Sequence, residues 1–192
     1  RSEWVEAVAI KGDKIIYAGD EAGARSLCGE NTEVTDLAGK MMLAGFIDGH
    51  CHPVLAAHYL CGVYLQIEWG VEECLAEIEK YVKANPDNET YFGIGYAEWI
   101  FDETGPKKEM LDAICADRPM MILGSSAHEA WVNSKALELA GITKDTPDPI
   151  PGFHYFHRDA EGEPTGHLLE MGTQNMIMEK INFFDRDTIE HV

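Results

Sequence analysis

An unbroken apolar run at residues 41–47, MMLAGFI, constrains the fold of this chain more than any other segment. The run has no polar alternation, so it predicts a strand that is buried on both faces, as the strands of parallel sheets are. After a loop, residues 71–86, VEECLAEIEKYVKANP, carry apolar side chains at helical spacing and end at a proline. A buried strand, a loop and an amphipathic helix together predict the first βα unit of an α/β barrel or open sheet.

Two histidines follow the apolar run almost at once, in the sequence Asp48-Gly49-His50-Cys51-His52. Alternate residues of a strand point to the same face, so the imidazoles of His50 and His52 would project together. Paired imidazoles on a rigid backbone are typical ligands of a divalent metal ion. The alternative is a pair of surface histidines at a strand end, and the spacing alone leaves both interpretations open.

The rest of the chain divides into shorter elements. Residues 4–10 and 14–20 are β-prone runs joined by Gly12-Asp13, and this pattern predicts a hairpin. The other expected elements are a helical or looped piece around 21–30, strands at 32–39, 90–99 and 118–126, a helix after Pro106, a helix from Asn133 or Ser134 to Gly141, a hairpin within 153–170 that turns at 160–162, and a last helix within 173–184.

The net charge of the chain argues against two classes of binding partner, nucleic acids and anionic membranes. It has 34 acidic and 15 basic residues and a formal charge of -19, which would repel phosphate backbones and anionic lipid. No apolar stretch approaches the roughly 20 residues that span a bilayer. The five cysteines are odd in number and irregularly spaced, as in reduced proteins. We therefore expect a cytoplasmic protein that binds a small-molecule substrate and neither nucleic acid nor membrane.

Four stretches follow one another in the order of a known family: AVAIKGDKIIYAGD, TEVTDLAGKMMLAGFIDGHCHP, AHEAWVNSKALELAGI and RDAEGEPTGHLLE. Together they resemble the amidohydrolase superfamily, and within it the amidohydrolase 3 branch typified by YtcJ-like proteins and N-substituted formamide deformylase. The first two stretches are general to amidohydrolases with an amino-terminal β-sandwich, whereas AWVNSKALELAGI and GEPTG are particular to this branch. The resemblance covers nearly the whole chain.

The resemblance implies an α/β fold, in which a metal-dependent TIM barrel is joined to a small β-sandwich. Residues 1–42 would be amino-terminal sandwich strands and 43–86 the first βα unit of the barrel. Residues 87–165 would be an α+β insertion particular to the branch, and 166–192 a return to the barrel. A complete barrel takes about 250 residues. The chain would then hold an incomplete barrel, and we expect it to be an amino-terminal fragment of a longer enzyme.

The resemblance also implies a chemistry, the hydrolysis of carbon–nitrogen bonds other than peptide bonds by metal-activated water. The substrates would be amides, formamides or cyclic amides. On this basis His50 and His52 would be first-strand ligands of a divalent metal, expected to be zinc, with one or two ions in the full-length enzyme. Glu170 would resemble a bridging ligand, and the alternative is an exposed glutamate at the start of a helix. The general acid–base aspartate would lie beyond residue 192, so the catalytic residues within this chain are unknown.

Three further residues are candidates for contact with substrate. His128 and Trp131 lie in HEAWVNS, and their spacing is that of one helical turn. Trp99 lies in AEWIFDETGP. Each could line a substrate pocket or pack in the core, and the sequence does not separate these roles. The histidines at 154, 157 and 167 lack ligand spacing and favour surface or hairpin-packing roles.

Two other classes of protein compete with the hydrolase. A stand-alone, non-catalytic binding module with a degenerate metal site would carry the same two histidines. A cupin-like metal enzyme also uses a His-x-His pair, but it needs a nearby glutamate and a run of short strands, whereas here a long helix follows. In a fragment the edges of strand one would be exposed, so we also expect aggregation, repacking or a homodimer.

Overall fold

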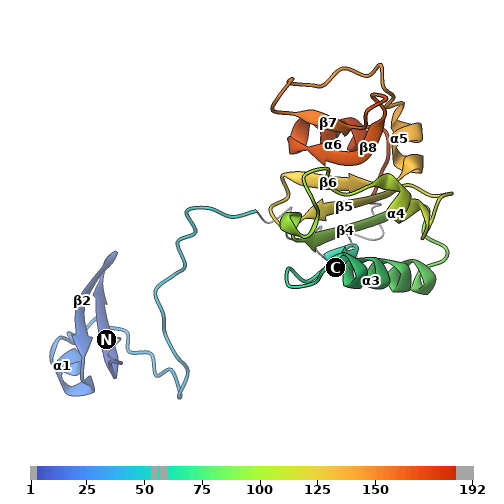
Figure 1. Ribbon diagram of the computed structural model, residues 1–192. Helices are drawn as coiled ribbons and strands as arrows, with labels where there is room; N and C mark the ends of the chain where they lie inside the picture. Colours follow the sequence, from blue (N-terminus) through green and yellow to red (C-terminus); the bar gives the residue numbers. More distant parts are fainter. Residues whose placement is uncertain (1–3, 53–55, 57–59, 185–192) are drawn as a thin grey trace. The chain divides into compact units, whose positions relative to one another are not determined.

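The computed structural model describes residues 4–52, 56 and 60–184. The chain divides into two compact units, residues 1–49 and 50–192, which we call the amino-terminal unit and the sheet unit (Figure 1). Strands β1 (Ala7–Lys11) and β2 (Lys14–Gly19) of the amino-terminal unit form an antiparallel hairpin. Helix α1 (Glu21–Ser26) follows, with Asp20 as its N-cap. The predicted hairpin and short helix are confirmed.

The predicted strands at 32–39 and 41–47 are wrong for this structure. Residues 27–52 contain no helix or strand, and the side chains of Phe46 and Ile47 are each 98% exposed. A strand needs a neighbour, because its backbone N–H and C=O groups point sideways and must be paired. No segment within the described ranges pairs with this run. The division of the chain at residues 42, 86 and 165 stays a prediction, and residues 185–192 of the last predicted segment lie outside the described residues.

The sheet unit is built on a mixed six-stranded sheet in the order β3-β4-β5-β6-β8-β7. Strands β3, β4 and β5 are parallel to one another, whereas β6, β8 and β7 each run antiparallel to the preceding strand in that order. The strands are β3 (Val63–Tyr64), β4 (Tyr91–Tyr96), β5 (Met120–Gly124), β6 (Glu129–Val132), β7 (Tyr155–Arg158) and β8 (Pro164–Leu169).

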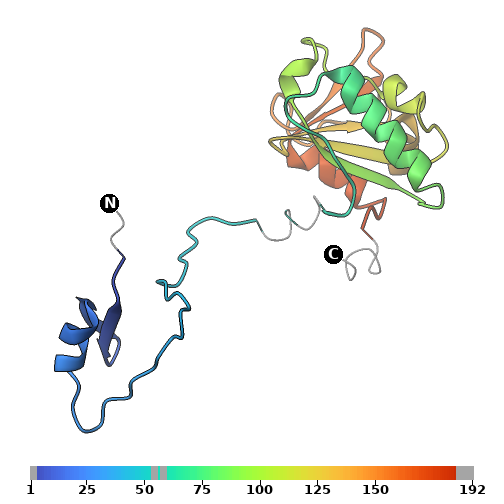
Figure 2. The ribbon, with the colours of Figure 1, turned by 90° about the horizontal axis from the view of Figure 1, so that it is seen from below.

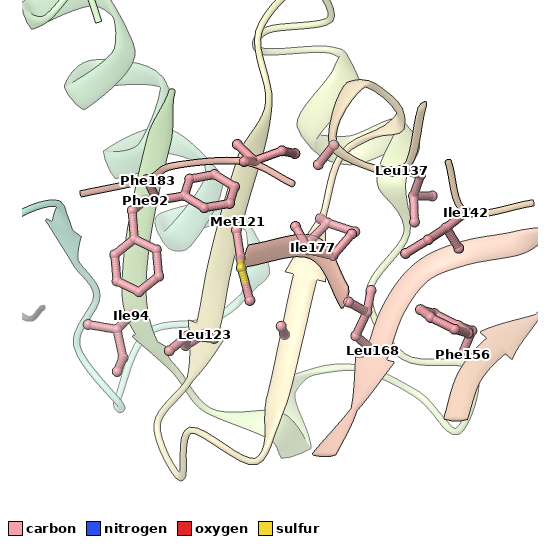
Figure 3. Close-up of a cluster of buried hydrophobic side chains, with 14 residues drawn as sticks. Phe92, Ile94, Met121, Leu123, Leu137, Ile142, Phe156, Leu168, Ile177 and Phe183 are labelled. Atoms are coloured by element: carbon pink, nitrogen blue, oxygen red, sulfur yellow. The ribbon is translucent and has the colours of Figure 1, made fainter. Parts of the chain in front are cut away.

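Helices cover both faces of this sheet (Figure 2). Helices α5 (Ser134–Ala140) and α6 (Glu170–Met178) pack on one face, over the apolar cluster in Figure 3. Helix α3 (Val71–Ala84), the short helix α4 (Lys108–Asp112) and the single 3-10 turn η1 (Glu98–Ile100) lie on the other. The mixed α/β class is therefore as expected. No helix among the described residues is long and apolar enough to cross a membrane.

Two helix predictions are confirmed in detail. Helix α3 buries Cys74, Ile78 and Val82 on one face and ends before Pro86. Helix α5 begins after Asn133, whose side chain accepts a hydrogen bond from the N–H of Ala136, and ends at Gly141 in the left-handed conformation. The hairpin of β7 and β8 is also confirmed.

The strand directions bring the ends of several strands to one edge of the sheet. The carboxyl ends of β3, β4, β5 and β8 lie at this edge, together with the amino ends of β6 and β7. We call it the carboxyl edge. Loops at such an edge are the usual place for ligand sites in α/β proteins, because several strands present side chains there.

Candidate functional site

Polar side chains from three separate segments meet at the carboxyl edge. Glu98 follows β4, Ser125 and Ser126 follow β5, His128 precedes β6, and Glu170 follows β8. Hydrogen bonds join Glu98 to both serines and His128 to Glu170. The sheet therefore assembles one polar cluster from residues that are far apart in the sequence.

The centre of this cluster is a histidine–glutamate pair. Nδ1 of His128 lies 2.9 Å from Oε2 of Glu170. The backbone N–H of Glu170 also donates to the carbonyl of His128, at 2.7 Å. The hydrogen bond and the negative charge of Glu170 raise the pKa of His128 above its ordinary value. A predicted metal ligand and a predicted substrate contact thus lie side by side, because β6 pairs with β8.

Ala127, just before His128, and Glu170 itself both have a left-handed backbone conformation, which residues other than glycine rarely adopt. The φ angle is 61° at Ala127 and 68° at Glu170. Such left-handed residues cost free energy and persist where surrounding contacts hold them, often at functional sites. One of these contacts is the hydrogen bond from the buried Gln174 amide to the carbonyl of Ala127, at 3.0 Å. The geometry of the pair is therefore fixed by its neighbours.

A second carboxylate stands close to the pair. Glu98 accepts hydrogen bonds from the backbone N–H and the hydroxyl of Ser126, at 2.9 and 2.7 Å, and from the hydroxyl of Ser125, at 3.0 Å. Partial burial would raise the pKa of Glu98, but these hydrogen bonds outweigh it and lower the pKa below its ordinary value. The ionised Glu98 further favours protonated His128. The cluster can thus hold a proton on His128 and offer carboxylate oxygens to a cation.

The two candidate tryptophans occupy opposite environments. Trp131 is fully buried, packs against the rings of Tyr96 and Phe101, and donates its indole N–H to the carbonyl of Lys107 at 2.8 Å. Trp99, in η1, is 71% exposed. The predicted helical spacing of His128 and Trp131 is wrong, because Trp131 lies in strand β6 and His128 lies in the turn just before it. The predicted substrate contacts of His128, Trp99 and Trp131 stay predictions.

His50 and His52 point their imidazoles at each other. Their Nε2 atoms are 2.8 Å apart, and both side chains are exposed. Two histidine ligands of one tetrahedral zinc ion have nitrogens about 3.3 Å apart, given Zn–N bonds of about 2.05 Å. The pair therefore fits two positions of a zinc site with a small adjustment. Within the part of the chain that the structure describes, no group of three or more His, Cys, Asp or Glu side chains is arranged to hold a metal ion.

A second histidine–glutamate pair lies on the sheet face that α3 and α4 cover. Nε2 of the buried His167 is 2.8 Å from Oε2 of Glu129, and the ring of His157 stacks on that of His167. The hairpin-packing role predicted for these histidines is confirmed. Sequence reasoning missed Glu129 and Glu98, because neither has a characteristic spacing and only the order of the strands brings them to their partners.

Comparison with known proteins gives the family. The model of the amidohydrolase family known as Amidohydro_3 matches residues 33–191. The chain is 31% identical over 182 residues to the exoenzymes regulatory protein AepA of Pectobacterium carotovorum and 33% identical over 173 residues to N-substituted formamide deformylase of Arthrobacter pascens. These matches cover 92% and 88% of this chain, but 39% and 32% of the relatives.

Two further proteins support the same family assignment. The putative amidohydrolase YtcJ of Bacillus subtilis is 32% identical over 151 residues, which are 78% of this chain and 28% of that protein. The crystal structure of an uncharacterized metal-dependent hydrolase from Pyrococcus furiosus superposes with a TM-score of 0.51 and 26% identity, over 97% of this chain and 36% of the other. The chain spans between about a quarter and two fifths of the length of these proteins, and it belongs to the amidohydrolase family, in the amidohydrolase 3 branch.

Proposed function

We propose that this chain is the metal-binding, amino-terminal part of a hydrolase that cleaves carbon–nitrogen bonds other than peptide bonds. The observation that carries the proposal is the convergence of the His50 and His52 Nε2 atoms to 2.8 Å. Membership of the amidohydrolase family and the resemblance to a metal-dependent hydrolase support it. So does the similarity to N-substituted formamide deformylase, whose name identifies a formamide substrate.

The metal would be a divalent ion, and we propose zinc. When bound, it supplies a Lewis acid that activates water and polarises an amide-type carbonyl. In this proposal His50 and His52 hold the ion and Glu170 contributes a carboxylate oxygen to the same site or to a second ion. The general acid–base residue and the remaining ligands belong to parts of the enzyme outside this chain, which by itself is inactive.

The carboxyl edge of the sheet would contact the substrate. Protonated His128, held by Glu170, can donate a hydrogen bond from Nε2 to a substrate oxygen. Exposed Trp99, which follows Glu98 in η1, would offer an apolar surface. The substrate is a small amide, formamide or cyclic amide, and the enzyme works in the cytoplasm, where it could form a homodimer.

A cobalt titration of the purified chain tests the metal site. Co²⁺ replaces Zn²⁺ at histidine sites, and its paramagnetism broadens the NMR signals of the imidazoles that bind it. We expect the His50 and His52 signals to broaden first, and saturable binding to disappear in the double variant His50→Ala/His52→Ala. The control is Cys51→Ala, which alters the same segment and keeps both imidazoles. Equal binding by the wild type and the double variant would refute the assignment.

The activity is tested on the complete gene product. Zinc-loaded protein is incubated with a panel of formamides, linear amides and cyclic amides, and amine release is measured. We expect hydrolysis in the wild type and its loss in His50→Ala/His52→Ala. A metal-loaded wild type that binds these amides without hydrolysing any of them would instead favour the non-catalytic binding module.

A further inference from the structure

Two imidazoles of the β7–β8 hairpin lie stacked beneath residues 101–107, a segment that we call the strap. The ring centroids of His157 and His167 are 5.6 Å apart, and the rings are inclined by only 23°. Nε2 of His167 is bonded to Glu129. The Nδ1 atoms of both rings are buried and have no hydrogen-bond partner among the described residues. Buried polar atoms of this kind are rare, and those in a native protein call for an explanation.

The strap lies directly on these rings and is fastened near both ends. At its start, the ring of Phe101 packs on that of Trp131, with centroids 5.3 Å apart. At its end, the carbonyl of Lys107 accepts the indole N–H of Trp131 at 2.8 Å. In the middle, Gly105 has a φ of 67°, and a Cβ there would clash with the His167 imidazole. The strap is therefore a cover over the histidine pair.

The charges around the rings are unevenly matched. The carboxylate of Glu129 is the one acidic group bonded to either imidazole within the described residues. On the strap, Asp102 is bonded to its own neighbour Thr104. The ammonium of Lys107 acts on His157, and that of Lys108, at the start of α4, is bonded to the nearby carbonyl of Pro164. If both imidazoles were protonated, the single carboxylate could balance only one of them.

Tyr96, on β4, also interacts with Glu129. From β4, the hydroxyl of Tyr96 is buried without a partner among the described residues, and burial and the charge of Glu129 raise its pKa well above the ordinary value. Burial, then the charges of His167 and Lys107, lower the pKa of His157 below its ordinary value, although the backbone of Glu103 opposes this. These effects favour the neutral form of His157.

We propose that the strap is a pH-sensitive cover, closed while His157 is neutral and released in mild acid, when His157 gains a proton beside the His167–Glu129 pair. A cation on the partly buried His157 has no carboxylate partner among the described residues and is disfavoured by the ammonium of Lys107, so it is unstable under the strap. Release exposes both rings to water, which supplies the missing hydrogen bonds. Because the strap follows η1 directly, release also loosens the segment that carries Glu98 and Trp99 at the carboxyl edge.

NMR spectroscopy of the intact chain between pH 8 and pH 5 tests the cover. The Trp131 indole N–H reports on the strap, because it is bonded to the carbonyl of Lys107. We expect this signal to shift with the same midpoint as the Cε1 proton of His157, and its exchange with solvent to accelerate at least tenfold beyond the intrinsic pH effect. The indole signal of the exposed Trp4, in the amino-terminal unit, should shift much less.

Variants distinguish the protonation of His157 from a nonspecific loss of structure at low pH. His157→Phe keeps a stacked ring without a titratable group, and His157→Gln serves the same purpose if the phenylalanine is not accommodated. In either variant the Trp131 indole should keep its neutral-pH signal down to pH 5. The control is His154→Gln, which removes a histidine outside the strap and should release it as the wild type does. A Trp131 signal that is unchanged by acid in the wild type, or that changes equally in the His157 variants, overturns the proposal.

Discussion

Replacement of Asn133 by alanine should be among the most destabilising single changes in the sheet unit. The side chain is fully buried and makes four hydrogen bonds. Oδ1 accepts from the backbone N–H groups of Met120 and Ala136, both at 3.0 Å, and Nδ2 donates to the carbonyls of Cys115 and Arg118 at 2.9 and 2.8 Å. One amide thus caps helix α5 and also fastens the turn before β5.

The magnitude follows from the groups left behind. Loss of an N-cap costs about 1 kcal/mol. Each of the other three backbone groups loses a partner in the interior, and a lower bound of about 1 kcal/mol for each brings the total to about 4 kcal/mol. Domains of this size are stable by about 5–15 kcal/mol. The variant should therefore lose a large part of its free energy of unfolding.

Urea unfolding, followed by the near-UV signal of the buried tryptophan, measures this loss. Asn175→Ala is the matched control, because Asn175 is exposed on helix α6. The control should change the free energy of unfolding by less than about 0.5 kcal/mol. A loss below about 1 kcal/mol for Asn133→Ala would contradict the reasoning, since it would mean that the freed backbone groups find other partners without cost.

Three other changes have defined outcomes. Gly105→Ala should lower the free energy of unfolding by about 2–3 kcal/mol, because it places a side chain on a left-handed residue and against the His167 imidazole. The control is Gly152→Ala, at a φ of 78° with open space around it, which should lower the free energy of unfolding by only about 1 kcal/mol in the same urea experiment. Glu170→Gln should lower the pKa of His128, because the charge that raises this pKa is removed. The NMR titration of the His128 Cε1 proton measures the change, and an unmoved midpoint would show that the pair does not form in solution. Burial and a neighbouring glutamate raise the pKa of the Cys74 thiol to about 11, so this thiol should resist a thiol reagent at pH 8 until the protein unfolds. If Cys74 were labelled as fast as the exposed cysteines, helix α3 would not be packed on the sheet.

Local patterns predicted the elements that local interactions determine. Helix α3 followed from the spacing of Cys74, Ile78 and Val82, and helix α5 from its cap at Asn133 and its end at Gly141. The cap also implied that the residues before it are not helical, and this signal could have shown that His128 and Trp131 do not lie on a helix. Each of these elements satisfies its own backbone or is fixed by a few neighbouring residues.

Predictions that depended on distant partners were less successful. The apolar run at 41–47 has the composition of a buried strand, but burial requires neighbours that the described residues do not supply. The approach of Glu170 to His128, and of Glu98 to the serines after β5, depends on the order of strands in the sheet. That order is not encoded in any short segment, so the residues could be nominated individually but not placed together.

The neighbouring positions of β6 and β8 also bear on how this protein can diversify. His128 and Glu170 are joined through the ladder of these two strands, although the chain leaves the sheet between them for helix α5 and the loop at 142–154. Doubling the length of a flexible loop costs only about 0.6 kcal/mol in closure entropy. Insertions or exchanged sequences in that loop would therefore leave the pair in register, so related proteins could acquire new loops, and a protein engineer could graft one, without rebuilding the residues at the carboxyl edge.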